Sequence, residues 1–207
     1  MRYLYFFSSF LLLLLLAACS SPYKHLQQAL DAQPGCAQGL APQFDKVIYN
    51  TQVDVMGKQL SGLLIFKTMP DGSKRAVFTS ETGPTLFDFE FNGEAFTKHF
   101  CIEKLDRKPV VRTLRRDLSL LLMEGIGEPG GQVLQDGQLL YFPFKKGKET
   151  AWLLTDRQCS QLLRIENASK RKKKTIISFS PTEKALPDTA LIEHQNFNFA
   201  IRLIKLR

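Results

Sequence analysis

The stretch that best predicts the fold is residues 78–91, with the sequence Phe78-Thr79-Ser80-Glu81-Thr82-Gly83-Pro84-Thr85-Leu86-Phe87-Asp88-Phe89-Glu90-Phe91. In the second half of this stretch, aromatic and acidic residues alternate with a period of two, which is typical of a strand with one buried face. The Gly83-Pro84 pair favours a turn. We therefore expect two antiparallel strands joined by a tight connection, with the phenylalanines on one face.

The same pattern continues on both sides of this stretch. Turn signals occur at Met56-Gly57, Pro70-Asp71-Gly72, Gly83-Pro84 and Asn92-Gly93. Parallel neighbours would need connections of about a dozen residues, so strands joined this tightly form an antiparallel meander. The segments between the turns are rich in β-branched and aromatic residues, and they predict strands at 47–56, 60–69, 74–80, 86–91 and 95–105.

An amphipathic helix is predicted at 109–124, because Pro109 stands in its first turn and Gly125 follows its last. One stripe of this helix is apolar, whereas Arg112, Arg115 and Arg116 gather on another, so we expect the apolar stripe to pack on a sheet. The stripe consists of Val111, Leu114, Leu118, Leu121 and Leu122.

A shorter helix is predicted at 22–33 from the helical spacing of Tyr23, Leu26 and Leu30. Residues 181–187 are expected to be a loop, followed by a turn of helix. Further strands are predicted at 132–134, 138–144, 149–155, 159–166, 175–180 and 196–206. The chain should thus be mostly β, of the α+β class, with a single antiparallel, strongly curved sheet of about ten or eleven strands and two or three covering helices.

Strand periodicity and the helix stripe together place many large apolar residues toward one interior. Two interpretations are open, an ordinary filled core and a cavity for an apolar ligand. The cavity is favoured, because a sheet of ten or more strands has a larger apolar face than two or three helices can fill. The predicted ligand-binding residues are Leu64, Phe66, Phe78, Phe87, Phe89, Phe91, Phe96, Phe100, Leu118, Leu121, Phe197 and Phe199.

The formal net charge of the 207-residue chain is +8, and five of its positive charges stand together in the run Lys170-Arg171-Lys172-Lys173-Lys174. This run predicts a solvated hairpin tip, with contact to anionic lipid headgroups as the alternative. No aromatic residues interleave with the run, so the stacking surfaces of single-strand binders are missing. We expect no nucleic-acid partner.

The N-terminus determines the expected compartment. The apolar stretch 3–18 follows Arg2 and is shorter than the roughly 20 residues that span a bilayer, so residues 1–18 are predicted to be a signal peptide. The sequence Leu16-Ala17-Ala18-Cys19 resembles the bacterial lipobox, which implies cleavage before Cys19 and its modification by acyl chains such as palmitate. Because no acidic run follows Cys19, the resemblance suggests lipid anchoring in the outer membrane, at the periplasmic face.

Signals of catalysis are weak. Residues 125–130 match GxGxxG, but they follow a helix and contain a proline, so they read as a loop. His99, Cys101 and Glu103 lie on one predicted strand face and extend over roughly 13 Å, which is too far for one metal ion to bind all three. We expect no catalytic residue, no metal and no cofactor.

Cysteine spacing leaves the disulfide question open. If Cys19 is acylated, Cys36, Cys101 and Cys159 remain, and at most one bridge can form among them. Free thiols are slightly favoured, because the spacings show no disulfide framework.

Several of these features together resemble the LolA/LolB lipoprotein-carrier superfamily, and more narrowly the LolB-like outer-membrane lipoproteins. They are the lipobox, the short helix, the segment Ser61-Gly62-Leu63-Leu64-Ile65-Phe66, the stretch 78–91 and the amphipathic helix. As an order of elements, the resemblance covers most of residues 22–207. It implies an unclosed half-barrel whose concave apolar face holds acyl chains, in a protein without catalysis.

The expected organisation is therefore a lipidated segment with a short helix at 19–35 and a lipid-binding half-barrel domain at 36–207. Its expected partners are lipid acyl chains or lipoproteins and the membrane, reached through acylated Cys19, and we expect a monomer. The alternative is a structural accessory lipoprotein whose groove binds a protein partner.

One position departs from the family pattern that the resemblance implies. In LolB, the membrane-facing tip carries an exposed leucine before a glycine, whereas here Thr82 precedes Gly83. A leucine side chain gains about 1.5–3 kcal/mol on leaving water, and a threonine hydroxyl prefers water. Transfer of lipoproteins into a bilayer is therefore not expected of this chain.

Substitution Cys19→Ala tests the anchor. Because the thioether to lipid needs a thiol, we expect the variant to remain unprocessed or to become soluble, as measured by fractionation and by intact mass. A processed variant that stays in the membrane, or an unmodified Cys19 in the wild type, would contradict the prediction.

Overall fold

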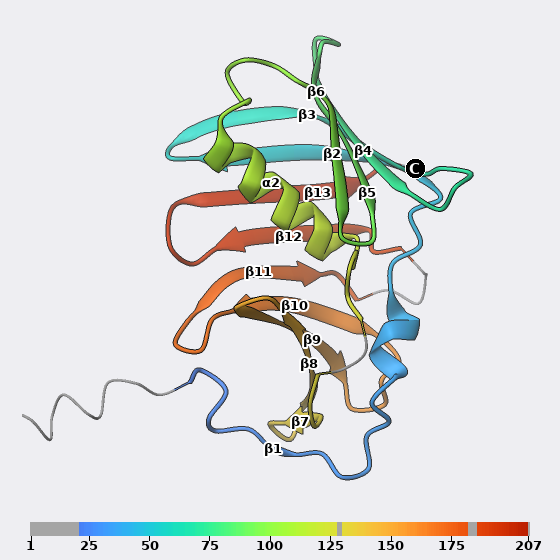
Figure 1. The fold of residues 1–207 in the computed structure, drawn as a ribbon, viewed down its shortest axis with the longest axis vertical. Coiled ribbons are helices and arrows are strands. Elements are labelled where there is room, and N and C mark those ends of the chain that lie inside the picture. The colour runs from blue at the N-terminus through green and yellow to red at the C-terminus, as the bar shows by residue number, and fades with distance from the viewer. Residues whose placement is uncertain (1–20, 128–129, 182–185, 207) are drawn as a thin grey trace, which may run out of the picture.

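The structure is a computed structural model, and it describes residues 21–127, 130–181 and 186–206 (Figure 1). The predicted signal peptide, residues 1–18, and the predicted lipidation site Cys19 lie outside the described residues.

Within the described residues, thirteen strands form one sheet in the order β1-β7-β8-β9-β10-β11-β12-β13-β2-β3-β4-β5-β6. All neighbouring strands are antiparallel. Because β1 and β6 are edges that do not pair with each other, the sheet is not closed into a barrel. The strands are β1 (Gln27–Gln28), β2 (Lys46–Val55), β3 (Lys58–Thr68), β4 (Lys74–Ser80), β5 (Thr85–Asn92), β6 (Ala95–Cys101), β7 (Leu134–Gln135), β8 (Leu139–Lys146), β9 (Glu149–Asp156), β10 (Leu162–Ala168), β11 (Lys173–Phe179), β12 (Thr189–His194) and β13 (Phe199–Lys205).

The predicted meander is confirmed, and β4 has the predicted bounds. Most connections are tight turns between sequence neighbours, whereas the pairing of β13 with β2 brings the C-terminal strand beside the first long strand. The strands at both ends of the sheet curl away from the central ones, and α2 (Lys108–Leu121) lies across the side toward which they curl (Figure 1).

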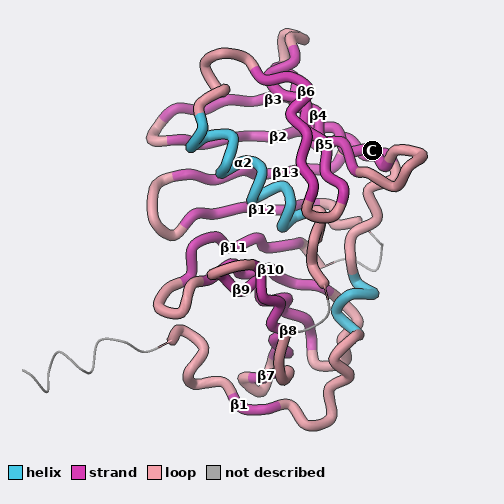
Figure 2. Tube along the Cα trace, in the orientation of Figure 1, coloured by secondary structure: helices cyan, strands magenta, loops and turns pink. Residues whose placement is uncertain are grey.

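The amphipathic helix is confirmed as α2, which carries proline at the start and buries Leu114, Leu118 and Leu121. It ends three residues earlier than predicted, because Met123 has a φ of 54°, a left-handed conformation that no helix continues. Figure 2 shows one further short helical segment in the described chain, the 3-10 helix η1 (Cys36–Leu40). The expectation of two or three covering helices is not met.

The predicted helix at 22–33 is wrong. Residues 22–25 form turns, and Gln27–Gln28 is the short edge strand β1, which pairs with β7. Tertiary contacts outweigh helical spacing here, because Tyr23 stacks on Trp152, with ring centroids 4.2 Å apart, and its hydroxyl donates to Glu166 at 2.8 Å. The apolar residues at helical spacing therefore belong to a non-helical segment, whose Tyr23 packs on the sheet.

The turn of helix expected after residue 187 is also wrong, because residues 189–194 form a strand. They form β12, a central strand between β11 and β13. Ala190, Ile192 and His194 alternate as its buried residues, so the strand has the period of two typical of one buried face. The buried histidine and the short length weaken this pattern in the sequence.

The main core fills the space between α2 and one face of the sheet. Near its centre, His194 Nε2 lies 2.6 Å from Asp117 Oδ2, and both side chains are buried. This contact joins the C-terminal half of α2 to the end of β12. A smaller cluster of Tyr23, Tyr141 and Leu154 covers the opposite face of the sheet, because alternate residues of a strand point to opposite faces.

The basic run is divided between two environments. Residues 170–172 form the tip of the β10–β11 hairpin, as predicted. Lys173 and Lys174 instead belong to β11, where they pair with Glu166 and Glu149, respectively. Part of the charge that the sequence concentrates here is therefore neutralised within the fold.

A disulfide joins Cys36 to Cys159, so the preference for free thiols is wrong for these two residues. Cys101 is the free cysteine among the described residues. The bond closes a sequence separation of 123 residues, which no local spacing reveals. It ties η1 to the turn between β9 and β10.

Substituting both Cys36 and Cys159 by Ser should lower the free energy of unfolding by about 2–5 kcal/mol, because a long loop is no longer closed in the unfolded chain. Denaturant melts of wild type and variant measure this difference. As a chemical check, alkylation of the unfolded, unreduced wild type should label Cys101 and leave Cys36 and Cys159 unlabelled. Labelling of all three would contradict the bond.

Candidate functional site

An apolar cavity of about 430 Å³ lies between α2 and the concave side of β2, β3, β4, β5 and β13. Of the described residues that line it, Thr51 and Thr113 carry a side-chain oxygen, and none carries a charge. The lining residues are Thr51, Val53, Val55, Met56, Leu60, Leu64, Phe78, Phe87, Leu105, Pro109, Val110, Thr113, Leu114, Leu118, Phe197, Phe199 and Ile201.

The two threonines are the polar residues of the cavity wall, and they differ in their surroundings. The hydroxyl of Thr51 donates to the carbonyl oxygen of Tyr49 at 3.2 Å, so it already has a hydrogen-bond partner. Thr113 sits on α2 at the boundary of the cavity. Because burying an unpaired polar group is unfavourable, a wall of this composition suits hydrocarbon.

The mouth of the cavity has an apolar rim, formed by Val55, Met56 and Phe197. Met56 is 81% exposed and Phe197 is 46% exposed. Met56 and Gly57 have φ angles of 49° and 81° in the β2–β3 turn, which places the methionine at the turn's tip. The backbone N–H of Met56 donates to the carbonyl oxygen of Asn198, so the two hairpin tips that carry Met56 and Phe197 adjoin.

The structure places half of the twelve predicted ligand-binding residues around this cavity. These are Leu64, Phe78, Phe87, Leu118, Phe197 and Phe199. Phe66, Phe89 and Leu121 are instead buried in the filled part of the core, and Phe91, which is also buried, lines a second cavity beside α2. One part of the apolar face is therefore a filled core, and another part borders a cavity.

Phe96 packs at the edge of that filled part, with its ring centroid 5.2 Å from that of Phe89 and 5.4 Å from that of Phe91. The guanidinium carbon of Arg115 lies 4.9 Å from the centroid of the same ring. Phe96 thus faces the interior as predicted but does not line the apolar cavity.

The placement of Phe100 on the concave face is wrong. The pairing of β5 with β6 shifts register between Asp88 and Phe89. Phe89 pairs with Lys98, whereas Asp88 pairs with Phe100. A bulge of this kind reverses the face on which later residues lie. Phe100 consequently lies opposite Asp88 and is 47% exposed, whereas Cys101 lies opposite Phe87 and packs on the core.

Val53, Val110 and Thr113 line the cavity but are not among the twelve residues predicted from the sequence. Val53 lies two residues from Thr51 and Val55 on β2, so the period of two was a usable signal. Val110 and Thr113 share a helical face with Leu114. Valine is smaller than the predicted leucine and phenylalanine residues and threonine is polar, so these three positions do not stand out in the sequence.

Thr82 and Gly83 form the exposed turn between β4 and β5, where Gly83 has a φ of 104°. The hydroxyl oxygens of Thr82 and Ser80 lie 3.0 Å apart. This turn projects no large apolar side chain, in contrast to the rim at Met56 and Phe197. Its role as the membrane-facing tip stays a prediction.

The candidate metal residues have other partners. His99 Nε2 lies 2.8 Å from Glu90 Oε2, and the bulge separates it from Cys101. Burial raises the pKa of the Cys101 thiol, and Asp106 adds to the shift, so this thiol is protonated at neutral pH. In the chain as described, no group of three or more His, Cys, Asp or Glu residues could hold a metal ion.

No helix in the described ranges is long and apolar enough to cross a membrane. No protein-family model and no curated protein matches the chain. Among solved structures, a DUF1329 family protein from Desulfovibrio piger is similar at a TM-score of 0.47 and 13% identity, over 85% of this chain and 92% of that one.

A Vibrio parahaemolyticus domain named for outer membrane lipoprotein sorting is similar at a TM-score of 0.45 and 8% identity, over 83% of this chain and 87% of that one. Such scores and identities are too low to place the chain in a family or to assign it a function. The functional argument therefore depends on the cavity itself.

Phe89 and Phe197 allow a direct test of which part of the face is filled. Phe89 is fully buried against Phe87 and Phe96, so Phe89→Ala should lower the free energy of unfolding by about 3–5 kcal/mol. Phe197→Ala removes a half-exposed rim residue and should cost less than about 1 kcal/mol. Equal losses in denaturant melts would show that this division is wrong.

Proposed function

We propose that this chain is a lipid-anchored cell-envelope protein that binds an acyl chain in the apolar cavity and catalyses no reaction there. The observation that carries the proposal is a cavity of about 430 Å³ whose described lining has no charged side chain. This volume lies within the range of about 300–1,000 Å³ that is common for ligand sites.

The chemistry of the wall favours a hydrocarbon ligand. Each methylene group of a bound chain that leaves water contributes about 0.8 kcal/mol, and this gain needs no polar partner. A ligand rich in hydroxyl or charged groups would lose its hydration and find Thr113 as its main polar contact. An acyl chain fits this wall better than a sugar, a nucleotide or a charged peptide.

The exposed rim gives such a chain a route from a membrane. Val55, Met56 and Phe197 keep apolar surface in water at the mouth, and this arrangement becomes favourable when the surface contacts lipid or another apolar surface. Methionine adapts its unbranched side chain to varied ligands. The predicted acylation of Cys19 would keep this mouth near the membrane, which agrees with the proposed binding of acyl chains from lipids or lipoproteins.

Binding of tritiated palmitate by the purified chain tests the proposal. Val53 lines the cavity, so Val53→Trp should fill it and weaken binding by at least about tenfold, because several buried methylene groups are lost. Gln52 is exposed on the same strand and does not line the cavity. Gln52→Trp therefore serves as the matched control and should bind like the wild type.

Native mass spectrometry of protein purified without detergent gives a second measurement, in which co-purified lipid is expected. A wild type that binds no palmitate and carries no lipid would overturn the proposal. If the cavity instead retained a peptide or protein segment, the structural accessory role would replace it. Thermal melts of both tryptophan variants verify that they fold.

A further inference from the structure

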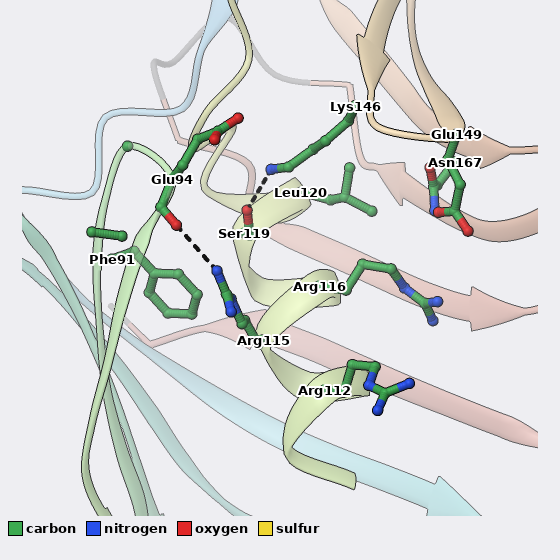
Figure 3. A pocket seen from close by; sticks show the side chains of 12 residues that line it. Phe91, Glu94, Arg112, Arg115, Arg116, Ser119, Leu120, Lys146, Glu149 and Asn167 are labelled. Carbon is green, nitrogen blue, oxygen red and sulfur yellow. Dashed lines mark hydrogen bonds between the residues drawn. The ribbon is translucent and has the colours of Figure 1, made fainter. Parts of the chain in front are cut away.

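A second cavity, of about 370 Å³, lies along a different face of α2 (Figure 3). It is bounded by the β5–β6 turn at Glu94, by α2 and by the β8–β9 hairpin. We call it the basic cleft, because Arg112, Arg115, Arg116 and Lys146 line it.

Two of these cations have terminal guanidinium nitrogens that donate to no residue in the described part of the chain, and Arg116 has Asp117 as its one ion-pair partner there. Arg112 makes no hydrogen bond or ion pair with any residue in the described part of the chain. Arg116 contacts Asp117 through Nε at 3.4 Å, and its terminal nitrogens donate to no described residue. Figure 3 shows both side chains extending from the same side of α2, the side on which Glu149 and Asn167 also lie.

The other two cations are held in place by neutral groups. Arg115 donates to the carbonyl oxygen of Glu94 at 3.1 Å. Lys146 donates from Nζ to the hydroxyl of Ser119 at 2.8 Å and to the carbonyl oxygen of Glu124 at 2.7 Å. An ammonium group has three donors, so Lys146 retains one for a ligand. Burial lowers the pKa of Lys146. A bound anion would oppose this shift, because an opposite charge favours the charged ammonium form.

Folding alone does not account for this arrangement. Lys108, Arg112 and Arg116 follow one another at intervals of four residues, and like charges at this spacing destabilise a helix. The first turn of α2 contains no acidic residue, although negative charge is favoured there. The one carboxylate of the helix, Asp117, is buried against His194. An anionic ligand would offset this repulsion.

The carboxylates beside the cleft restrict the size of the anion. Glu149 is already paired with Lys174 and accepts a hydrogen bond from Asn167. Glu94 stands at the other wall, beside Lys146. An extended polyanion would meet the carboxylates of both walls, so these walls favour a compact anion held by the arginines of α2.

We propose that the basic cleft binds a phosphate group, free or as part of a lipid headgroup, between the guanidinium groups of Arg112 and Arg116. Planar guanidinium groups bind phosphate oxygens through paired hydrogen bonds, and a spacing of four residues brings the two groups to the same side of α2. The site is separate from the apolar cavity, so it does not depend on the proposed function.

Calorimetric titration of the full chain in a nonionic detergent tests the site, with sodium phosphate in one arm and dihexanoyl phosphatidylglycerol in the other. Arg112→Gln combined with Arg116→Gln should weaken binding by at least about tenfold, because two charge-assisted contacts are lost. Glutamine retains high helix propensity. Circular dichroism and unchanged palmitate binding verify that the variant folds.

The matched control is Lys170→Gln combined with Arg171→Gln, which removes the same charge from the exposed β10–β11 tip. It should alter affinity by less than about twofold, the size of a general electrostatic effect at moderate salt. Comparable affinity in both arms assigns the site to free phosphate, and binding of the lipid alone assigns it to a headgroup. Failure of the wild type to bind either probe, or an equal loss in the control, would overturn the proposal.

Discussion

The contact between Asp117 and His194 sets the position of α2, and the rest of the interior follows from that position. The two buried side chains meet at 2.6 Å between the C-terminal half of the helix and β12. Removing one partner of such a buried pair commonly costs about 3–5 kcal/mol, because the other is left desolvated. Apolar contacts from Leu114, Leu118 and Leu121 are non-directional and would tolerate sliding or rotation of the helix, whereas this pair would not.

With its position set in this way, α2 divides the concave side into two chemically different spaces. Its Val110, Thr113 and Leu114 face an apolar cavity, and its Arg112 and Arg116 face a basic cleft. Both spaces exist because one helix is too narrow to cover the concave side of a thirteen-stranded sheet. The amphipathic pattern of a single segment thereby determines what each space can bind.

An open sheet also has two edges that must be protected from pairing with other chains. At one edge, β1 has only two residues, and the adjoining Tyr23 packs on Trp152 on the convex side. At the other edge, β6 carries a register shift and the ion pair of Lys98 with Asp106. The disulfide from Cys36 to Cys159 ties the N-terminal segment to the turn between β9 and β10.

Local patterns in the sequence determined the meander, the turn positions and α2, because each depends on neighbouring residues: a period of two, a glycine or proline turn, an apolar stripe. They also determined that large apolar residues share an interior. Only the tertiary structure decided where that interior is filled, since Phe89 and Phe87 have the same alternation yet lie in the core and at the cavity, respectively. It alone decided that Tyr23 joins the sheet rather than a helix, that a bulge exposes Phe100, and that Cys36 meets Cys159. Each of these outcomes depends on contacts between residues far apart in the chain, and local periodicity contains no information about such contacts.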